Sequence, residues 1–144
     1  ANADTELQYF GQDIFEAADK ENGLDDPAYL QALATSRGLA SAALNQFFAH
    51  DKIDVIIAQT NGPAWLSTLG KGDAFSGPSA SQLPAVAGFP HLTVPMGLSA
   101  GLPVGLSFIG PKWHDHKVLK AGYAYEQLSK ARVLPKFSST IESK

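Results

Sequence analysis

Proline and glycine recur through one apolar stretch, from Pro84 to Gly110, and their spacing limits what the chain can fold into. Proline cannot donate a hydrogen bond to a β-sheet, so it marks strand ends or edges. Glycine allows positive φ or a close approach of two backbones. The stretch predicts two short strands, Leu92 to Val94 and Val104 to Ile109, joined by a glycine-bounded loop over 97–101. Strands joined by so short a connection are expected to pair antiparallel.

Helical periodicity predicts two helices ahead of this stretch. Thr5 and Gln8 have the spacing of a capping box, and the apolar spacing that follows predicts a helix from about Glu6 to Lys20. A second helix is expected to follow Asp26, which would be its N-cap, with proline at the first helical position. Gly38 predicts a kink or a break in that helix.

The remaining segments complete a mixed α/β pattern. The β-branched run over 53–58 predicts a strand covered on both faces, and residues 64–81 have the composition of a long surface loop. A helical turn is expected over Gln82 to Ala87, and a last helix from Asp115 to about Arg132 carries Tyr123, Tyr125 and Leu128 toward the core. Three strands are too few for a closed sheet, so we expect part of a larger one.

Composition excludes several classes of function. The 144 residues are 44% hydrophobic and 17% charged, which is typical of a soluble globular domain. The net charge is −3 and the 11 basic residues are scattered, so no nucleic-acid partner is expected. No apolar run reaches the roughly 20 residues of a membrane span, and the opening residues do not form a signal peptide, so no membrane partner is expected. The absence of cysteine excludes disulfides and thiolate chemistry but leaves the cellular compartment open.

A series of short motifs resembles the C-terminal region of the amidase signature family. A turn that reads Gln-Thr-Asn-Gly-Pro, at residues 59–63, is followed in order by Ala-Gly-Phe-Pro at 87–90 and Val-Pro-Met-Gly at 94–97. Gly-Leu-Pro-Val-Gly at 101–105 and Phe-Ile-Gly-Pro at 108–111 complete the series. The upstream helices and the corner from Gly62 to Trp65 are similar to bacterial peptide amidases. The likeness to the family is more specific than the likeness to that branch.

The resemblance implies a mixed central sheet flanked by helices and a hydrolase that cuts carboxamides, with peptide C-terminal amides as the substrate class. In the family a serine attacks the amide carbonyl, a second serine relays the proton and a lysine acts as base. These groups belong to an N-terminal half that this chain does not contain. We therefore expect no catalytic residue, cofactor or metal here. We expect residues 1–144 to form a single partial domain without activity of its own, and 138–144 to be a frayed tail.

The serine-rich segment from Ser76 to Ser81 superficially resembles the family's catalytic loop. It lacks the pair of adjacent serines and the flanking glycines, and it follows a strand that lies after the catalytic part in the family. We interpret the segment as a surface loop.

The candidate substrate-binding residues are Thr60, Asn61, Gly62 and Trp65. If the preceding strand is an inner parallel strand, this turn lies beyond its carboxyl end, where open α/β sheets bind ligands. Thr60 and Asn61 would then hold an amide or carboxylate, and Trp65 would wall the pocket. Phe75 in the long loop is a further candidate for that lining role. The alternative is an ordinary turn with Trp65 in simple packing.

The histidines do not predict a metal site. His114 and His116 are two residues apart and would not share a helix face, and Asp115 between them fits an N-cap. His50 and His91 have no third ligand nearby in sequence.

Two other classes of function stay open. One is a non-catalytic binding or scaffolding module derived from the amidase fold. The other is an ammonia-transferring amidotransferase component, which needs partner subunits and resembles this chain less well around Trp65. A piece of a larger sheet exposes an edge or an apolar face, so two copies of the chain are expected to associate through it.

Overall fold

The computed structural model describes residues 2–8, 10–50, 52–68 and 70–137. In chain order these residues form α1 (Ala3–Glu6), α2 (Asp13–Ala18), α3 (Pro27–His50), β1 (Ile56–Gln59), α4 (Gln82–Ala87), β2 (His91–Ser99), β3 (Leu102–Ile109) and α5 (Asp115–Ser129). Among these, no helix combines the length and the apolar character needed to cross a membrane. The expected frayed tail lies outside the described residues.

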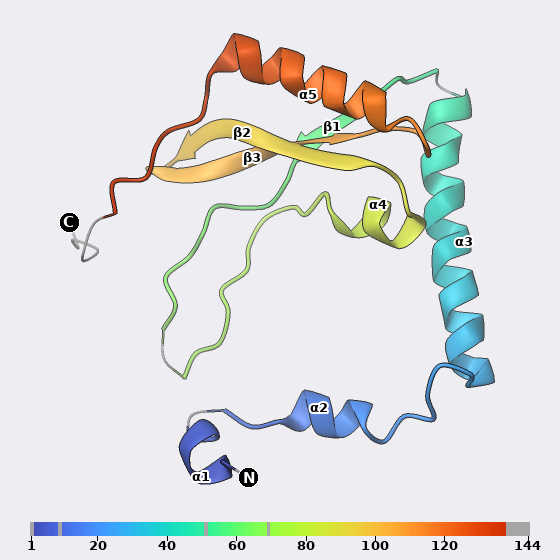
Figure 1. Cartoon of the computed structure of the whole chain (residues 1–144), viewed down its shortest axis with the longest axis vertical. Coiled ribbons are helices and arrows are strands. Elements are labelled where there is room, and N and C mark those ends of the chain that lie inside the picture. The colour runs from blue at the N-terminus through green and yellow to red at the C-terminus, as the bar shows by residue number, and fades with distance from the viewer. Residues whose placement is uncertain (1, 9, 51, 69, 138–144) are drawn as a thin grey trace.

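A three-stranded sheet in the order β1-β3-β2 forms the centre of the molecule (Figure 1). β2 and β3 form the predicted antiparallel hairpin, and Ser99 pairs with Leu102 across its tip. The turn between them is Ala100-Gly101, with φ of 50° and 81°. Positive φ at both central residues is the geometry of a type I′ turn, whose twist suits a tight hairpin. Local turn chemistry therefore fixes this pair of strands.

Among the described strands, β1 does not meet the condition of an inner parallel strand. β1 pairs antiparallel with β3, with Ile56 opposite Ile109, and within the described residues it lies at the edge of the sheet. β3 lies between β1 and β2, so these two strands run parallel without sharing hydrogen bonds. Ile57 is largely exposed, so the strand is not covered on both faces.

Helix α5 covers one face of the sheet. Val118 packs with Val94 and Phe108, and the rings of Tyr125 and Phe108 lie 5.8 Å apart. A Cβ added at Gly122 would collide with the end of the Leu92 side chain, so glycine allows the helix to lie this close to the sheet without moving that side chain.

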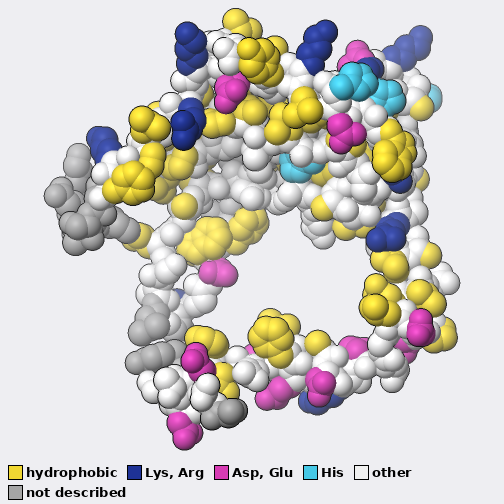
Figure 2. Space-filling model, viewed as in Figure 1, with side chains coloured by type: hydrophobic (Ala, Val, Ile, Leu, Met, Phe, Trp, Pro, Cys, Tyr) yellow, Lys and Arg dark blue, Asp and Glu magenta, His cyan; other side chains and the backbone are white. Residues whose placement is uncertain are grey.

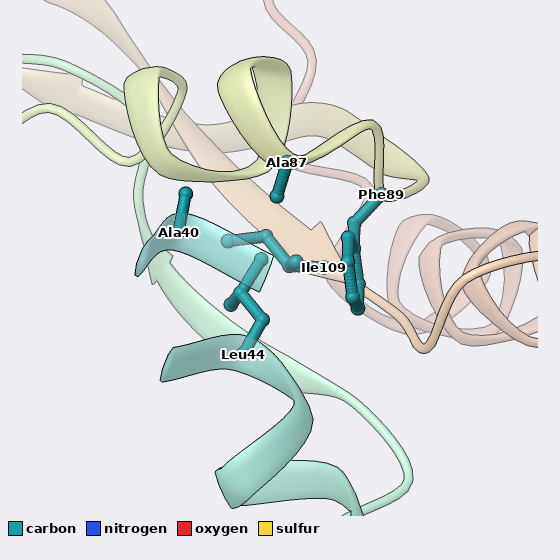
Figure 3. Close-up of a cluster of buried hydrophobic side chains, with 5 residues drawn as sticks. All are labelled: Ala40, Leu44, Ala87, Phe89 and Ile109. Atoms are coloured by element: carbon teal, nitrogen blue, oxygen red, sulfur yellow. The ribbon is translucent and has the colours of Figure 1, made fainter. Parts of the chain in front are cut away.

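The opposite face packs against α4 and the second half of α3. Figure 3 shows this cluster, in which Leu44 and Ala40 of α3 lie against Ala87, Phe89 and Ile109. Phe48 extends the cluster by stacking on Phe89, with ring centroids 6.2 Å apart. The core is thus two small clusters, one on each face of the sheet.

Helix α3 begins as predicted but is not interrupted. The Asp26 carboxylate accepts hydrogen bonds from the backbone N–H groups of Ala28, at 2.6 Å, and Tyr29, at 3.4 Å. The side chain of Asn22 and these backbone donors lower the pKa of Asp26. The helix continues through Gly38, so the predicted break is wrong. Tertiary contacts of Ala40 and Leu44 stabilise helix on the far side of the glycine.

The first predicted helix is divided in the structure. Thr5 lies inside α1, whose N-cap is Asn2, and Gln8 donates to the carbonyl of Asp4, so the capping box does not form. Phe10 and Ile14 are 70% and 77% exposed. A long amphipathic helix needs a partner for its apolar face, and these residues have none in the described part of the chain.

The last helix also differs in detail from its prediction. His114 occupies the N-cap position, and Asp115 is the first helical residue and caps nothing. Of the three residues expected to face the core, Tyr125 is half-buried, whereas Tyr123 and Leu128 are exposed. The helix ends at Ser129, before the predicted Arg132.

The molecule has the shape of a frame around a wide opening. Figure 2 shows this opening in the space-filling view, and Figure 1 identifies its sides as the sheet, α3, the α1–α2 segment and the loop between β1 and α4. The face of the sheet opposite α5 borders it. Large apolar side chains on the framing segments are exposed, among them Phe10, Phe15, Leu39, Leu66 and Phe75.

Candidate substrate-binding site

Thr60 lies where β1 ends and the long loop begins. Its backbone N–H donates to the carbonyl of Gly105 in β3 at 2.8 Å, and its own carbonyl accepts from the N–H of Ala80 at 3.0 Å. The residue is therefore held between the sheet and the second arm of the loop, which leads back to α4 and contains Ala80.

The Thr60 hydroxyl belongs to a polar network that crosses all three strands. Thr60 Oγ1 lies 2.6 Å from Thr93 Oγ1 and 2.8 Å from Ser107 Oγ. Ser107 Oγ lies in turn 2.7 Å from His91 Nε2. Thr93 pairs with Ser107 and His91 pairs with Ile109 across the ladder, so these side chains share the face opposite α5.

Gly105 makes this network sterically feasible. A Cβ at that position would lie 2.6 Å from Thr93 Oγ1 and 2.9 Å from Thr60 Oγ1. Any larger residue would separate the two hydroxyls, so they meet over the one residue of β3 that has no side chain.

His91 is neutral near pH 7, because burial lowers the pKa of its imidazole. A neutral imidazole carries one proton, so Nε2 either donates to Ser107 or accepts from it. Ser107 is fully buried, and its hydroxyl finds both of its partners within the network.

Gly62 and Asn61 lie where the two arms of the loop cross. A Cβ at Gly62 would collide with the carbonyl oxygen of Ser76, so glycine is needed for the arms to touch. The backbone carbonyl of Asn61 accepts from Gln59 Nε2 at 2.9 Å. The side-chain Oδ1 of Asn61 is buried and has no hydrogen-bond partner among the described residues. It is therefore an acceptor that could bind an N–H donor.

Trp65 pairs with Phe75 from the other arm of the loop. Their rings meet edge to face, with centroids 5.9 Å apart, and both side chains remain exposed, Trp65 at 38%. Phe75, the further candidate for lining the site, thus lies beside Trp65. The pair forms an apolar surface that a ligand could contact.

The structure joins Thr60, Asn61 and Gly62 in one turn and adds residues that the sequence interpretation missed. These are Thr93, Ser107 and His91, whose signal is the occurrence of polar residues at alternate positions of otherwise apolar strands. The serine-rich segment contributes a hydrogen bond between Ser79 and Ser81, at 3.1 Å.

The histidines near α5 form no cluster of metal ligands. Within the described ranges no group of three or more histidine or carboxylate side chains comes together. The rings of His114 and His116 lie 5.8 Å apart, and His114 Nδ1 lies 3.0 Å from the carbonyl of Lys112.

Comparisons with known proteins give a consistent match. The family model for amidases matches residues 11–119. The solved peptide amidase of Stenotrophomonas maltophilia is 41% identical with a TM-score of 0.83, over 96% of this chain and 28% of its own. A peptide amidase solved in complex with the competitive inhibitor chymostatin is 42% identical with a TM-score of 0.88, over 94% of this chain and 28% of its own.

Curated relatives agree with these structures. The A subunit of glutamyl-tRNA(Gln) amidotransferase from Lachnospira eligens is 37% identical over 115 residues, which is 74% of this chain and 22% of that protein. A probable amidase of Arabidopsis thaliana is 27% identical over 132 residues, or 91% of this chain and 22% of that protein. The chain thus spans about a quarter of the length of these relatives. The match over most of its residues and the shared mixed sheet with flanking helices show that the chain belongs to the amidase signature family.

Proposed function

We propose that this chain is the C-terminal, substrate-facing part of an enzyme that hydrolyses carboxamides. The observation that carries the proposal is the match to a solved peptide amidase over 96% of this chain but only 28% of that enzyme. The wide opening beside the sheet supports it, because apolar side chains border a space that this chain does not fill. Residues 1–144 then form a single partial domain.

The chemistry in this proposal lies outside the chain. The family's mechanism needs a nucleophilic serine, a relaying serine and a lysine, and the motif that carries the serines does not occur here. The acyl-enzyme would form and hydrolyse on those groups. This chain would supply the wall of the cleft and the scaffold behind it.

Thr60, Asn61, Gly62 and Trp65 are the proposed substrate-binding residues. The Thr60 hydroxyl would bind a polar group of the substrate, and the buried Oδ1 of Asn61 is an acceptor suited to an amide N–H. Gly62 allows the loop arms to cross, which holds Trp65 against Phe75. That aromatic pair would contact an apolar side chain of the substrate.

Peptide C-terminal amides are the proposed substrate class. Support comes from the identity of 41–42% to solved peptide amidases, one of them in complex with the competitive inhibitor chymostatin. A component of an amidotransferase is the second candidate, because curated relatives of that kind are 36% and 37% identical. The two candidates differ in the amide cut, which is a peptide amide in the first and glutamine in the second.

A chimera tests the proposal. This chain would replace the matching 28% of the Stenotrophomonas maltophilia peptide amidase, and ammonia release would be measured from a peptide amide and from glutamine. We expect turnover of the peptide amide. Trp65→Ala should lower kcat/KM about tenfold, equivalent to about 1.4 kcal/mol of transition-state binding.

Trp113→Ala is the matched control, because Trp113 is exposed and precedes α5, away from the loop. It should leave kcat/KM unchanged. Equal losses in the two variants would refute the assignment of Trp65. A folded chimera that releases ammonia from neither substrate would favour the non-catalytic scaffold instead.

A further inference from the structure

The proposed function leaves part of the polar network without a role. Thr93, Ser107 and His91 lie on the face of the sheet that borders the opening, yet none is among the residues proposed above. Thr93 is exposed at one end of the network, whereas Ser107 in its middle is fully buried. A partly buried chain of hydrogen bonds fixes the orientation of the exposed hydroxyl at its end.

If Thr60 and Ser107 both donate within the network, its protons all point the same way. Each hydroxyl has one proton to donate, and Thr60 and Ser107 each have two partners within the network. If His91 Nε2 carries the proton, it donates to Ser107, which donates to Thr60, which donates to Thr93. The proton of Thr93 is then free to point toward the opening. If Nε2 is unprotonated, the direction of every hydrogen bond in the network reverses. Thr93 then donates to Thr60, and only its lone pairs face the opening.

The two arrangements differ in which ring nitrogen of His91 carries the proton. Nε2 lies 2.7 Å from Ser107 Oγ, and Ser107 makes two hydrogen bonds whether Nε2 donates or accepts. Only the tautomer with the proton on Nε2 leaves the exposed hydroxyl of Thr93 with a proton to donate to a ligand. The ring is neutral because burial lowers the pKa of His91.

We propose that Thr93 is a substrate-binding residue, and that Ser107 and His91 are positioning residues which turn its hydroxyl proton toward the opening to bind a carbonyl or carboxylate oxygen. The inference deepens the proposed function and rests on it. The contact between the Thr60 and Thr93 hydroxyls requires glycine at position 105, because a side chain there would occupy the space in which they meet.

The first test determines the tautomer of His91 in the whole chain. Nitrogen-15 chemical shifts of labelled histidine separate a protonated ring nitrogen from a bare one, and a His91→Gln variant assigns the signal. We expect a protonated Nε2 and a bare Nδ1 near pH 7. A bare Nε2 would overturn the proposed ordering, whatever the activity of the intact enzyme.

The second test uses N-acetylphenylalaninamide as a probe. N-acetylphenethylamine is the control, because it keeps the acetyl amide but lacks the C-terminal carboxamide. Binding to the whole chain is followed by the NMR signals of the threonine methyl groups and by Trp65 fluorescence in a Trp113→Phe background. We expect the amide to shift the Thr93 methyl signal and the control to shift it less.

Variants separate a binding role for Thr93 from a structural one. Thr93→Val should raise the dissociation constant of the amide about fivefold, the effect of one hydrogen bond, and Thr93→Ser should restore it. Ser107→Ala should weaken binding in the same direction, because it cuts the link to His91. Thr68→Val, an exposed threonine in the loop, is the matched control and should bind as the unmodified chain does.

The outcomes distinguish this inference from the proposed function. If the amide changes Trp65 fluorescence but Thr93→Val binds it equally well, the role of Thr93 is wrong and the proposed site stands. If the amide perturbs neither residue, the binding site proposed for this chain is wrong and this inference falls with it.

Discussion

The sheet region and the segments that frame the opening use similar apolar residues with opposite results. Leu44, on the sheet side of α3, is 1% exposed, whereas Phe10 and Ile14 are 70% and 77% exposed. The difference lies in their partners, because α4, α5 and the hairpin cover each other while nothing described covers the α1–α2 segment. Exposed apolar side chains of this size are typical of interfaces. Under the proposed function, the framing segments are the surface against which the rest of the enzyme would pack.

Truncating Leu44 is expected to have the largest effect on stability. Leu44→Ala removes a fully buried side chain from the cluster on Ile109 and should lower the free energy of unfolding by about 2–5 kcal/mol. Leu39→Ala, on the same helix but 69% exposed, should change it by no more than about 0.5 kcal/mol. Urea denaturation measures both. Similar losses in the two variants would mean that the opening is filled in solution, for instance by a second copy.

Two glycine substitutions should act in opposite directions. Gly122→Ala drives a methyl group into Leu92 at the contact between α5 and the sheet and should destabilise the protein by about 1–3 kcal/mol. Gly38→Ala meets no atom within 4 Å in a continuous helix and should stabilise the protein by about 1 kcal/mol. Thermal unfolding of both variants checks the signs. A destabilising Gly38→Ala would indicate that α3 bends there after all.

Acidification should expose the contribution of His91. Because the pKa of His91 is lowered in the folded state, the unfolded chain takes up a proton first as the pH falls through about 6.5. The stability that this residue contributes is complete above that pH and is lost below it. Between pH 7 and pH 5 the unmodified chain should lose more unfolding free energy than His91→Gln, which keeps the other histidines. Parallel curves would show that His91 titrates alike in both states.

The ion pair between Lys117 and Asp54 should have the smallest effect. Lys117 Nζ lies 2.7 Å from the Asp54 carboxylate, whose side chain is 81% exposed. Lys117→Met should therefore change stability little, and salt should remove the change. The pKa of Asp54, which the hydrogen bond and charge of Lys117 lower, should rise toward its ordinary value in the variant. Carboxyl NMR titration measures that rise. An unchanged pKa of Asp54 would contradict an ion pair with Lys117 in solution.

Local chemistry explains which parts of the fold were predictable from the sequence. The Ala100-Gly101 hairpin and the Asp26 cap depend on residues a few positions apart, so the sequence predicts both. The orientation of β1 depends on its pairing with β3, in which Ala58 lies opposite Ser107, 49 residues later in the chain. No local sequence pattern contains that pairing. The helix predicted over 6–20 failed because periodicity shows an apolar face but not whether anything covers it.

The candidate site was predictable only in part for the same reason. The turn from Thr60 to Gly62 is contiguous and carries a recognisable motif. The network that holds it draws Thr93 and Ser107 from two further strands, and their proximity depends on the register over Gly105. A sequence pattern shows that Thr93 and Ser107 are polar, but only the assembled sheet shows that they touch the same hydroxyl.

Complementation would show whether this chain provides the scaffold and substrate wall of an amidase whose reactive groups lie elsewhere. The Stenotrophomonas maltophilia peptide amidase without the 28% that matches this chain would be mixed with the purified chain and assayed for ammonia release from a peptide amide. We predict no turnover by either piece alone and turnover by the mixture. Turnover by this chain alone, abolished by substitution of one of its own serines, would mean that the reactive groups lie within residues 1–144 and that the scaffold role is wrong.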